Sequence, residues 1–339
     1  MSEKKIAVLG SGANGASIGA DLFRAGHDVS FIEQWPEHVE AIRANGIRVE
    51  MPDVTETTRV PVFHLCEVAT LREQFDVVLV LVKAYDTRWA CELIKPHVKS
   101  DGLVVGMQNG MTIDAMADVV GAERTIGSVI EIASTMFIPG IVQRDTTRAK
   151  SWYAVGAFDT KAQGREEEVA SLLRQSGHVE ITSDIRSAKW MKLVANATEL
   201  VPSAILDMTV MEAVEVPGMR EFMTEAGREA ARTAVELGNH LVPILGLREE
   251  NIGTAEDFAE QLLGVVHDEY SIPGQKTTVL QDWTKGRRSE VDQVNGLVVE
   301  QQRKLGGKAP VNERIVEIAH KIESGEINRE AGNVDLLLA

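Results

Sequence analysis

Glycines at positions 10, 12 and 15 give the spacing G-x-G-x-x-G between an apolar run and an amphipathic segment. The turn consists of Gly10, Ser11, Gly12, Ala13, Asn14 and Gly15. Glycines at this spacing allow a strand to turn sharply into a helix, and they let a pyrophosphate approach the N–H groups at the helix N-terminus. A glycine-rich turn without a ligand is the alternative. The strand before the turn and the helix after it favour a dinucleotide-binding site.

An acidic residue, Glu33, ends the second predicted strand. A carboxylate at this place can accept hydrogen bonds from both hydroxyls of an adenosine ribose, which favours NAD. NADP carries a 2′-phosphate there and needs a cation, yet the first basic residue that follows is Arg43. We therefore expect NAD as the preferred cofactor, with NADP as the alternative. The competing interpretation is an acid that is simply solvated at the end of a strand.

Lys83 and Asn109 each follow an apolar run that is predicted to be a strand. Polar residues at the carboxyl ends of parallel strands lie where ligands bind in open α/β sheets, so we expect both residues to line the cofactor-binding cleft. A surface lysine and an ordinary Asn-Gly turn are the alternatives if each residue is considered alone.

A helical segment from about residue 185 carries Lys192, Asn196 and Leu200 at a spacing of four residues. At 100° per residue these side chains share one stripe, beside an apolar face. An ammonium group that borders an apolar face is partly desolvated, which lowers its pKa and allows it to protonate a developing alkoxide. Lys189 shares the stripe, and nothing intrinsic separates it from Lys192. A solvated helix face is the alternative interpretation.

The first half of the chain alternates short β-rich runs with helical patterns, which is typical of a parallel sheet covered by helices. Strands are predicted at residues 5–9, 28–33, 77–82, 103–107, 125–130 and 179–182, helices at 16–25, 86–96 and 165–175, and antiparallel hairpins at 46–64 and 138–156. From about residue 184 onward, segments with a 3.6-residue period dominate. We expect an α/β domain over residues 1–184 and an all-helical domain over 185–339.

Composition and charge exclude several classes of protein. The chain has 35 basic and 51 acidic residues, a formal net charge of -16, and since nucleic acid and anionic membranes require clustered Lys and Arg, we expect neither as a partner. No apolar run approaches the roughly 20 residues that span a bilayer. Residues 1–5 lead directly into a predicted strand, so a cytoplasmic location is expected.

The two cysteines, Cys66 and Cys91, lack the spacing of metal ligands. We therefore predict no metal site and expect both to be core thiols.

Six ordered motifs make the chain resemble the 2-dehydropantoate 2-reductase (ketopantoate reductase) family over nearly its whole length. They are the glycine turn, Val82-Lys83-Ala84, Gln108-Asn109-Gly110, Pro139-Gly140, the helix from Trp190 to Asn196, and Gln281-Asp282 with Ser289-Glu290-Val291-Asp292. The resemblance implies an N-terminal Rossmann-type, doubly wound sheet and a helical domain related to that of 6-phosphogluconate dehydrogenases. It also implies reduction of a 2-oxo acid by NADPH. A homodimer is the expected assembly.

The resemblance also implies roles for single residues, carried over by matching position. Lys192 would be the general acid, and Glu290 would be its partner or a substrate anchor. Asn109 and Asn196 would make polar contacts to cofactor or substrate. Thr278 would bind the carboxylate of the substrate.

Three positions depart from the pattern of the family. Leu200 stands where the family usually has an Asn, Thr278 where a Ser is common, and Gln34 where an Arg commonly follows the acid. Leu200 removes a polar substrate contact, because a substrate hydroxyl would face a methyl group. We therefore expect Leu200 to be a substrate-binding position that favours an apolar substrate over ketopantoate.

The expected function is NAD(P)-dependent hydride transfer between a nicotinamide and a 2-oxo or 2-hydroxy acid. One alternative is a relative within the family that works as a catabolic dehydrogenase on a different, more apolar hydroxy acid. Another is a dinucleotide-sensing protein without turnover. The presence of both Lys192 and Glu290 argues against a sensor, which needs no proton donor.

Overall fold

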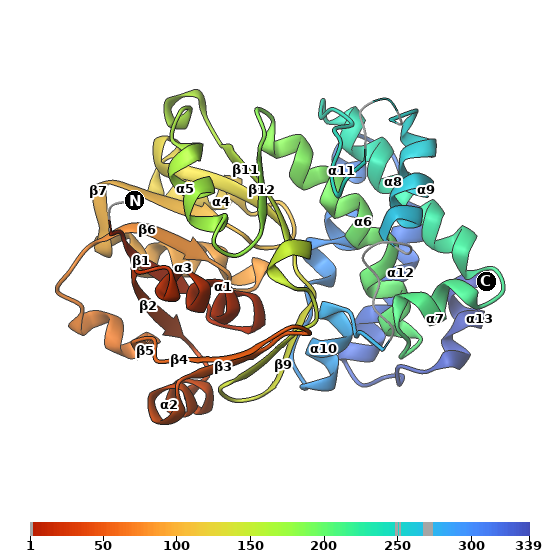
Figure 1. The fold of residues 1–339 in the computed structure, drawn as a ribbon. Coiled ribbons are helices and arrows are strands. Elements are labelled where there is room, and N and C mark those ends of the chain that lie inside the picture. Colours follow the sequence, from red (N-terminus) through yellow and green to blue (C-terminus); the bar gives the residue numbers. More distant parts are fainter. Residues whose placement is uncertain (1–2, 248–249, 251, 267–273) are drawn as a thin grey trace. The chain divides into compact units, whose positions relative to one another are not determined.

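The computed structural model describes residues 3–247, 250, 252–266 and 274–339, and the chain divides into two compact units (Figure 1). Unit 1 consists of Met1–Gln108 and Thr112–Ile185, and unit 2 consists of Asn109–Met111 and Arg186–Ala339. The expected organisation into two consecutive domains placed the short segment Asn109–Met111 in the first domain, whereas in the structure this segment groups with the helical unit, although it follows a strand of unit 1.

An eight-stranded sheet forms the centre of unit 1, with the strand order β12-β11-β8-β7-β6-β1-β2-β5. Its strands are β1 (Lys5–Leu9), β2 (Asp28–Glu33), β5 (Val62–His64), β6 (Phe75–Val80), β7 (Val98–Gly106), β8 (Thr125–Glu131), β11 (Trp152–Ala157) and β12 (His178–Ile181). Neighbouring strands are parallel, except that β11 runs antiparallel to β8. The strand order reverses at β1, which lies between β2 and β6, so the loops after β1 and β6 border the place where such sheets bind ligands.

Helices cover both faces of this sheet. They are α1 (Ala13–Arg24), α2 (Pro36–Asn45), α3 (Thr87–Ile94), α4 (Ile113–Val120) and α5 (Glu166–Leu173). Successive residues of a strand point to opposite faces, so Ile6 and Val8 of β1 join an apolar cluster with α1 and α5, whereas Ala7 and Leu9 join one with α3 and α4. The predicted α/β fold, a doubly wound sheet with an all-helical second part, is confirmed.

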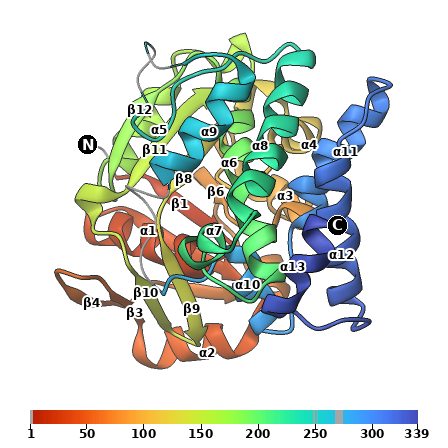
Figure 2. The same ribbon diagram turned by 90° about the vertical axis from the view of Figure 1, so that its right-hand side faces the viewer.

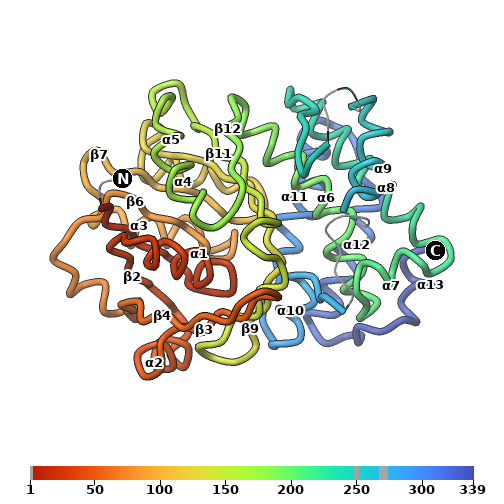
Figure 3. Tube along the Cα trace, viewed as in Figure 1, coloured from red at the N-terminus to blue at the C-terminus, as the bar shows by residue number. Residues whose placement is uncertain are grey.

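A second, four-stranded sheet in unit 1 has the strand order β4-β3-β10-β9. Its strands are β3 (Ile47–Glu50), β4 (Thr55–Thr58), β9 (Ser134–Ile138) and β10 (Ile141–Arg144). Figure 3 traces how segments far apart in sequence meet in it, since β10 pairs with both β3 and β9. The predicted hairpins are therefore partly wrong: β3–β4 and β9–β10 are antiparallel hairpins, but β5 and β11 pair with β2 and β8 of the large sheet.

The expectation for the cysteines is half right. Cys91 is buried, and its burial raises the pKa of the thiol to about 12. Cys66 is exposed, because the short 3-10 helix Leu65–Thr70 buries Val68 alone. Among the described residues, no helix is long and apolar enough to cross a membrane, and no group of three His, Cys, Asp or Glu side chains is placed to hold a metal ion.

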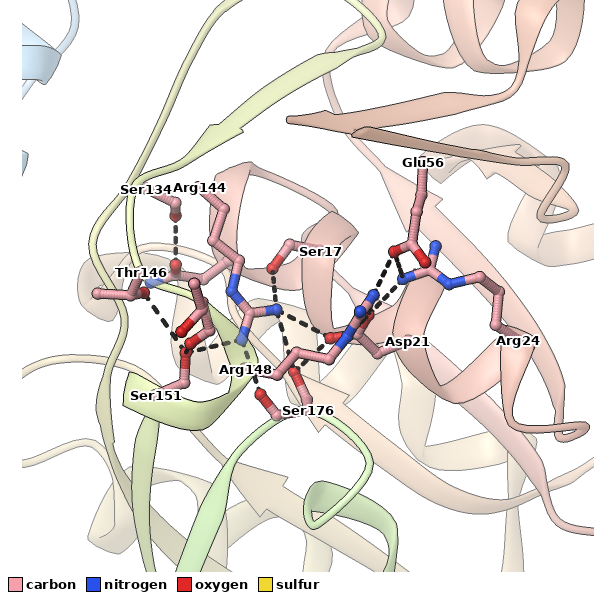
Figure 4. Close-up of polar contacts among 12 residues, drawn as sticks. Ser17, Asp21, Arg24, Glu56, Ser134, Arg144, Thr146, Arg148, Ser151 and Ser176 are labelled. Atoms are coloured by element: carbon pink, nitrogen blue, oxygen red, sulfur yellow. Dashed lines mark hydrogen bonds and ion pairs between the residues drawn. The ribbon is translucent and has the colours of Figure 1, made fainter. Parts of the chain in front are cut away.

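A buried ion pair joins the small sheet to α1 (Figure 4). Arg144, at the end of β10, is fully buried, and its Nη1 lies 2.8 Å from Oδ2 of Asp21 on α1. Arg144 Nη2 also donates to Ser151 Oγ and to the carbonyl of Ser176, each at 2.7 Å. The other carboxylate oxygen of Asp21 accepts from Arg148 Nε at 2.9 Å. These contacts fix the position of the β9–β10 hairpin on the first helix.

Unit 2 is helical, and its described residues from 186 onward contain no strand (Figure 2). The helices are α6 (Ile185–Ile205), α7 (Val210–Glu215), α8 (Met219–Glu236), α9 (Ala255–Val265), α10 (Thr278–Thr284), α11 (Asn295–Lys304), α12 (Pro310–Glu323) and α13 (Val334–Leu338). An apolar cluster with members from α6, α7, α8, α10 and α12 forms the core. The longest described helix, α6, carries the candidate residues Lys192, Asn196 and Leu200.

We expect Asp21→Asn to lower the free energy of unfolding by about 3 to 5 kcal/mol, because it leaves the buried guanidinium of Arg144 without a counter-charge while keeping the side-chain shape. The measurement is urea unfolding. The control is Asp118→Asn, which removes an exposed ion pair with Arg88 in the same unit and should cost under about 1 kcal/mol. Equal losses of stability in the two variants would contradict the role of Asp21 as the counter-charge of the buried Arg144.

Candidate functional site

The glycine turn between β1 and α1 has the form that a pyrophosphate requires. At Gly12, the N-cap of α1, φ is -63° and an added Cβ atom would meet nothing within 4 Å. Neither conformation nor packing demands a glycine there, so the open space suits a ligand that approaches the backbone. Gly10 differs, because its φ is +92° and a Cβ would lie 2.7 Å from the Val82 nitrogen; at Gly15 a Cβ would lie 2.2 Å from the Gly10 carbonyl oxygen. Gly10 and Gly15 build the turn, and Gly12 leaves room for phosphate.

The N-terminus of α1 also suits an anion. Within the described residues, no side chain caps this end of the helix, and its first turn contains no acidic residue. The first N–H groups of a helix lack partners inside the helix, and the helix dipole adds positive potential there. The predicted dinucleotide site therefore fits both the shape and the electrostatics of this turn.

Glu33 is buried beside the glycine turn and is not a solvated strand end. It is only 6% exposed. Its Oε1 accepts from the backbone nitrogens of Gln34 at 2.9 Å and Trp35 at 3.0 Å, and its Oε2 accepts from Ser11 Oγ at 3.1 Å. A carboxylate has about four acceptor positions, so it can still accept hydrogen bonds from ribose hydroxyls. The contact with Ser11 joins the acid to the glycine turn.

The first basic residue after Glu33, Arg43, is committed elsewhere. Its guanidinium donates to the Val62 carbonyl, to Glu67 and, at 3.0 Å, to Glu40. The hydrogen bond to Glu67 is the main reason that the pKa of Arg43 is raised above its ordinary value. Arg43 therefore has its charge balanced by two carboxylates.

The loops after β6 and β7 carry the next two predicted positions. Lys83 is partly buried and precedes a 3-10 turn at Ala84–Asp86. The Gln108 side chain donates to Thr87 Oγ1 at 2.7 Å and accepts from Thr112 Oγ1 at 3.1 Å, so it ties together the starts of α3 and α4. Gln108 thus supports the loop from inside unit 1, and Asn109 next to it belongs to unit 2.

In unit 2 the structure brings two predicted residues together. The amide nitrogen of Asn196 on α6 donates to Oδ1 of Asn109 at 3.1 Å. Asn196 is 2% exposed, and Asn109 is partly buried. Asn196 has a further N–H and its own carbonyl oxygen for other contacts. The pair places amide groups beside the stripe that also carries Lys192.

The start of α10 is fixed to α6 by a threonine next to Thr278. Thr277 is the N-cap of α10, and its hydroxyl accepts from the Leu280 nitrogen and donates to the Leu200 carbonyl at 3.1 Å. Because Thr277 serves as the cap, the hydroxyl of the partly buried Thr278 is not needed for capping. Thr278 is thereby held near the Leu200 turn of α6.

Glu290 is 5% exposed and lies just before a 3-10 turn, Val291–Gln293. The segment in front of it is held by Glu323, at the end of α12. Glu323 Oε1 accepts from the Ser289 nitrogen at 2.9 Å, from Ser289 Oγ at 2.6 Å and from Trp283 Nε1 at 2.9 Å. Sequence reasoning missed Glu323, because an acid at a helix end gives no signal that it holds a distant loop.

The helix pattern did not separate the two lysines of α6, but the structure shows that they differ in burial. Lys189 is 3% exposed, and burial lowers its pKa from 10.5 to about 8. Lys192 is only partly buried. The desolvated ammonium that the helix pattern predicted is therefore found at Lys189. The role of Lys192 as general acid stays a prediction that rests on position within the motif.

Leu200 packs inside unit 2. It is 9% exposed and belongs to the apolar cluster that also contains Val279 and Trp283 of α10. The preceding residue, Glu199, is 7% exposed and lies seven residues after Lys192, so it shares the helical stripe of that lysine. Sequence reasoning did not single out Glu199, although a charged residue within an apolar helical stretch was the available signal.

Comparison with known proteins shows the family to which the chain belongs. Residues 6–159 match the family described as ketopantoate reductase PanE/ApbA, and residues 184–323 match its C-terminal part. The chain belongs to the ketopantoate reductase family. As a member of this family it is an NAD(P)-dependent oxidoreductase that acts on a CH–OH group.

Relatives of this ketopantoate reductase family member match it over nearly their whole length. A 2-dehydropantoate 2-reductase from Archaeoglobus fulgidus is 25% identical, with 96% of this chain and 100% of the relative covered. One from Mesorhizobium japonicum is 27% identical, with 94% and 97% covered. A ketopantoate reductase structure from Ralstonia eutropha has a TM-score of 0.80 at 27% identity, covering 95% of this chain and 99% of that one. D-mandelate dehydrogenase with NADH and anilino(oxo)acetate shares the fold, with a TM-score of 0.84 at 21% identity and coverage of 94% and 98%.

Lys189→Met should change the pH dependence of stability. In the native state the pKa of Lys189 is about 8, against 10.5 as the ordinary value. Between these two values the unfolded chain binds more protons, so the free energy of unfolding of the wild type rises with pH. The variant should be the more stable protein at pH 7, and its advantage should shrink between pH 8 and pH 10.5. Urea unfolding of the wild type and the variant across this range measures the difference in stability, and a difference that does not change with pH would contradict the prediction.

Proposed function

We propose that this chain is an NADH-preferring reductase of 2-oxo acids with apolar or aromatic side chains, with the matching 2-hydroxy acid as product. The observation that carries the proposal lies on α6, which keeps Lys192 and the buried Asn196 of the family motif but has Leu200 where the family usually has an amide. The reacting end of the substrate keeps its polar partners, and its far end meets an apolar side chain.

A nicotinamide dinucleotide supplies a hydride to the 2-oxo carbon when it is bound. The remaining chemistry falls to side chains of this chain. Lys192 donates a proton to the oxygen of the former carbonyl, so that a 2-oxo acid, one hydride and one proton give the 2-hydroxy acid. Thr278 binds the substrate carboxylate, Asn196 contacts the substrate beside Asn109, and Glu290 anchors the substrate or orients Lys192.

Two observations support NADH over NADPH. The buried carboxylate of Glu33 lies where the adenosine ribose binds in this fold, and it would repel a 2′-phosphate. The first cation along the chain, Arg43, already pairs with Glu40 and Glu67. Lys83 and the glycine turn would hold the phosphates.

The apolar side chain of Leu200 and one protein with the same fold support an apolar substrate. Leu200 offers only methyl groups, so a hydroxyl at the far end of ketopantoate would lose its hydrogen-bond partner. The fold shared with D-mandelate dehydrogenase accommodates NADH and anilino(oxo)acetate in that protein. A cytoplasmic location and a homodimeric assembly stay predictions.

We expect kcat/KM for NADH to exceed that for NADPH by about 10-fold or more, because Glu33 repels the additional phosphate. Glu33→Gln should narrow the ratio, since it removes the charge and keeps the shape. Glu37→Gln, which changes an exposed acid just beyond, is the control and should leave the ratio unchanged. Steady-state assays with both cofactors measure it, and a wild-type preference for NADPH would refute the assignment of Glu33.

Lys192→Ala should lower kcat by at least about 10²-fold and leave the Kd for NADH within about 2-fold, because a proton donor acts in the transition state. Lys189→Ala should change kcat by only a few-fold, since its side chain is enclosed in the protein. Turnover assays and NADH titration separate the two effects. If the two substitutions exchanged their effects, Lys189 would be the proton donor. Wild-type protein that binds the dinucleotide but reduces no oxo acid would instead indicate a sensor.

The choice of substrate tests the proposal most directly. We expect kcat/KM for an aromatic or branched apolar 2-oxo acid to exceed that for ketopantoate by about 5- to 150-fold, the ratio that corresponds to one unpaired buried polar group costing about 1 to 3 kcal/mol. Leu200→Asn should raise the value for ketopantoate and lower that for the apolar acid. Leu200→Met, which keeps an apolar side chain, should preserve the wild-type order. Efficient ketopantoate reduction that Leu200→Asn does not improve would place the chain among enzymes of pantothenate biosynthesis.

A further inference from the structure

A fully buried histidine, His38 on α2, lies next to the glycine turn. Its Nε2 is 2.9 Å from the Ser11 carbonyl oxygen, and its Nδ1 is 2.9 Å from the backbone nitrogen of Gly140. A backbone N–H can only donate, so Nδ1 accepts and carries no proton. The proton is therefore on Nε2, which donates to Ser11. The ring is neutral, with both nitrogens in use.

Gly140 belongs to the tight turn between β9 and β10, and that turn is fixed on other sides as well. Its φ is +79°, a conformation that favours glycine, and an added Cβ would lie 3.0 Å from the Ala41 side chain. Its carbonyl accepts from the Arg48 nitrogen of β3 at 2.9 Å. The Pro139-Gly140 motif thus forms a rigid point from which the N–H reaches His38.

The same hairpin touches the glycine turn a second time. At the start of β9, the hydroxyl of Ser134 donates to Oδ1 of Asn14. At the end of β10, Arg144 forms an ion pair with Asp21 on α1 (Figure 4). The β9–β10 hairpin therefore contacts the glycine turn directly at Asn14 and, through His38, at Ser11. It is also anchored to α1, the helix that follows the turn.

The ring of His38 supports the ribose end of the site too. It stacks on Trp35 with the ring centroids 5.8 Å apart and the planes at 23°. The Trp35 backbone nitrogen donates to Glu33 at 3.0 Å, and Ser11 Oγ donates to the other oxygen of that carboxylate. Ser11 and Trp35 are thus the two partners of Glu33 that His38 holds.

We propose that His38 is a positioning residue for the dinucleotide, which transfers the fixed position of the β9–β10 hairpin to Ser11 and Glu33. The turn then has its binding shape before the ligand arrives, and pre-organisation of this kind raises affinity because less freedom is lost on binding. The inference rests on nicotinamide dinucleotide binding at this turn, not on the preference for NADH or on the choice of oxo acid.

The test is fluorescence titration of the wild type and of His38 variants with NADH and with NADPH. The Kd values are compared for the cofactor that the wild type binds more tightly. His38→Phe keeps the stack on Trp35 but removes both hydrogen bonds, and we expect Kd and KM for the cofactor to rise about 10-fold or more, with kcat at saturation within about 2-fold. His38→Gln has an amide that can donate to the Ser11 carbonyl and offer its oxygen to the Gly140 nitrogen, so it should recover most of the affinity. His38→Asn is too short to reach Ser11 and should resemble His38→Phe.

The control is His27→Phe, which makes the same change in the same unit. His27 accepts a hydrogen bond from the Lys4 nitrogen at 3.3 Å, beyond the other end of α1, and its loss should leave cofactor Kd within about 2-fold. An unchanged cofactor Kd in His38→Phe would overturn the proposal. So would a fall in kcat and in melting temperature without a change in Kd, which indicates a merely structural histidine.

A double variant tests whether one hairpin carries both contacts. If it does, removing either contact loosens the same element, so Ser134→Ala combined with His38→Phe should weaken cofactor binding by less than the product of the two single effects. A loss equal to that product would mean that the two contacts act independently, and it would overturn the role of the hairpin. Failure to reduce any oxo acid would leave these binding results unaffected and would refute only the proposed function.

Discussion

The ion pair between Asp21 and Arg144 is the constraint on which the organisation of unit 1 depends. A charged pair in a fully buried place needs hydrogen bonds to offset its desolvation, and hydroxyls and a carbonyl from Ser151 and Ser176 supply most of them here. Within the described residues, the only polar atom of this pair that lacks a partner is the Nε of the Arg144 guanidinium. The pair binds a strand of the small sheet to the first helix of the large one. Because α1 begins with the glycine turn, the same pair that places the small sheet also determines what lies beside that turn.

Unit 2 uses polar contacts in a comparable way, but to hold loops against one long helix. Thr277 connects the start of α10 to the Leu200 carbonyl, Glu323 holds Ser289 in front of Glu290, and Asn196 binds Asn109. Each contact involves residues far apart in sequence, and each lies next to a residue with an implied role. Thr277 and Glu323 thereby hold the segments of Thr278 and Glu290 without an implied role of their own, whereas the amide pair joins two residues that both have one.

The sequence predicted best those features that arise within a few neighbouring residues. The first βαβ unit was predicted with strands at the observed residues, Lys5–Leu9 and Asp28–Glu33, because apolar runs and a glycine turn are local signals. Partners at a distance were not predictable in this way: β5 and β11 were expected in hairpins but extend the large sheet. The burial of Lys189 and the exposure of Cys66 likewise depend on which elements pack around them. Residues of a motif could be named from the resemblance, but their supports Glu323 and His38 could not.

The chain path at Asn109–Met111 has a consequence for how such enzymes can be recombined. The chain enters unit 2 for three residues, returns to unit 1 at Thr112 and leaves it for good after Ile185. A chimera of two family members joined only at residue 185 would combine the Asn109 segment of one parent with the α6 of the other. The amide pair between Asn109 and Asn196 would then consist of residues that had never been selected together. Modular exchange in this fold therefore requires three crossover points rather than one, with the tripeptide inherited along with the helices.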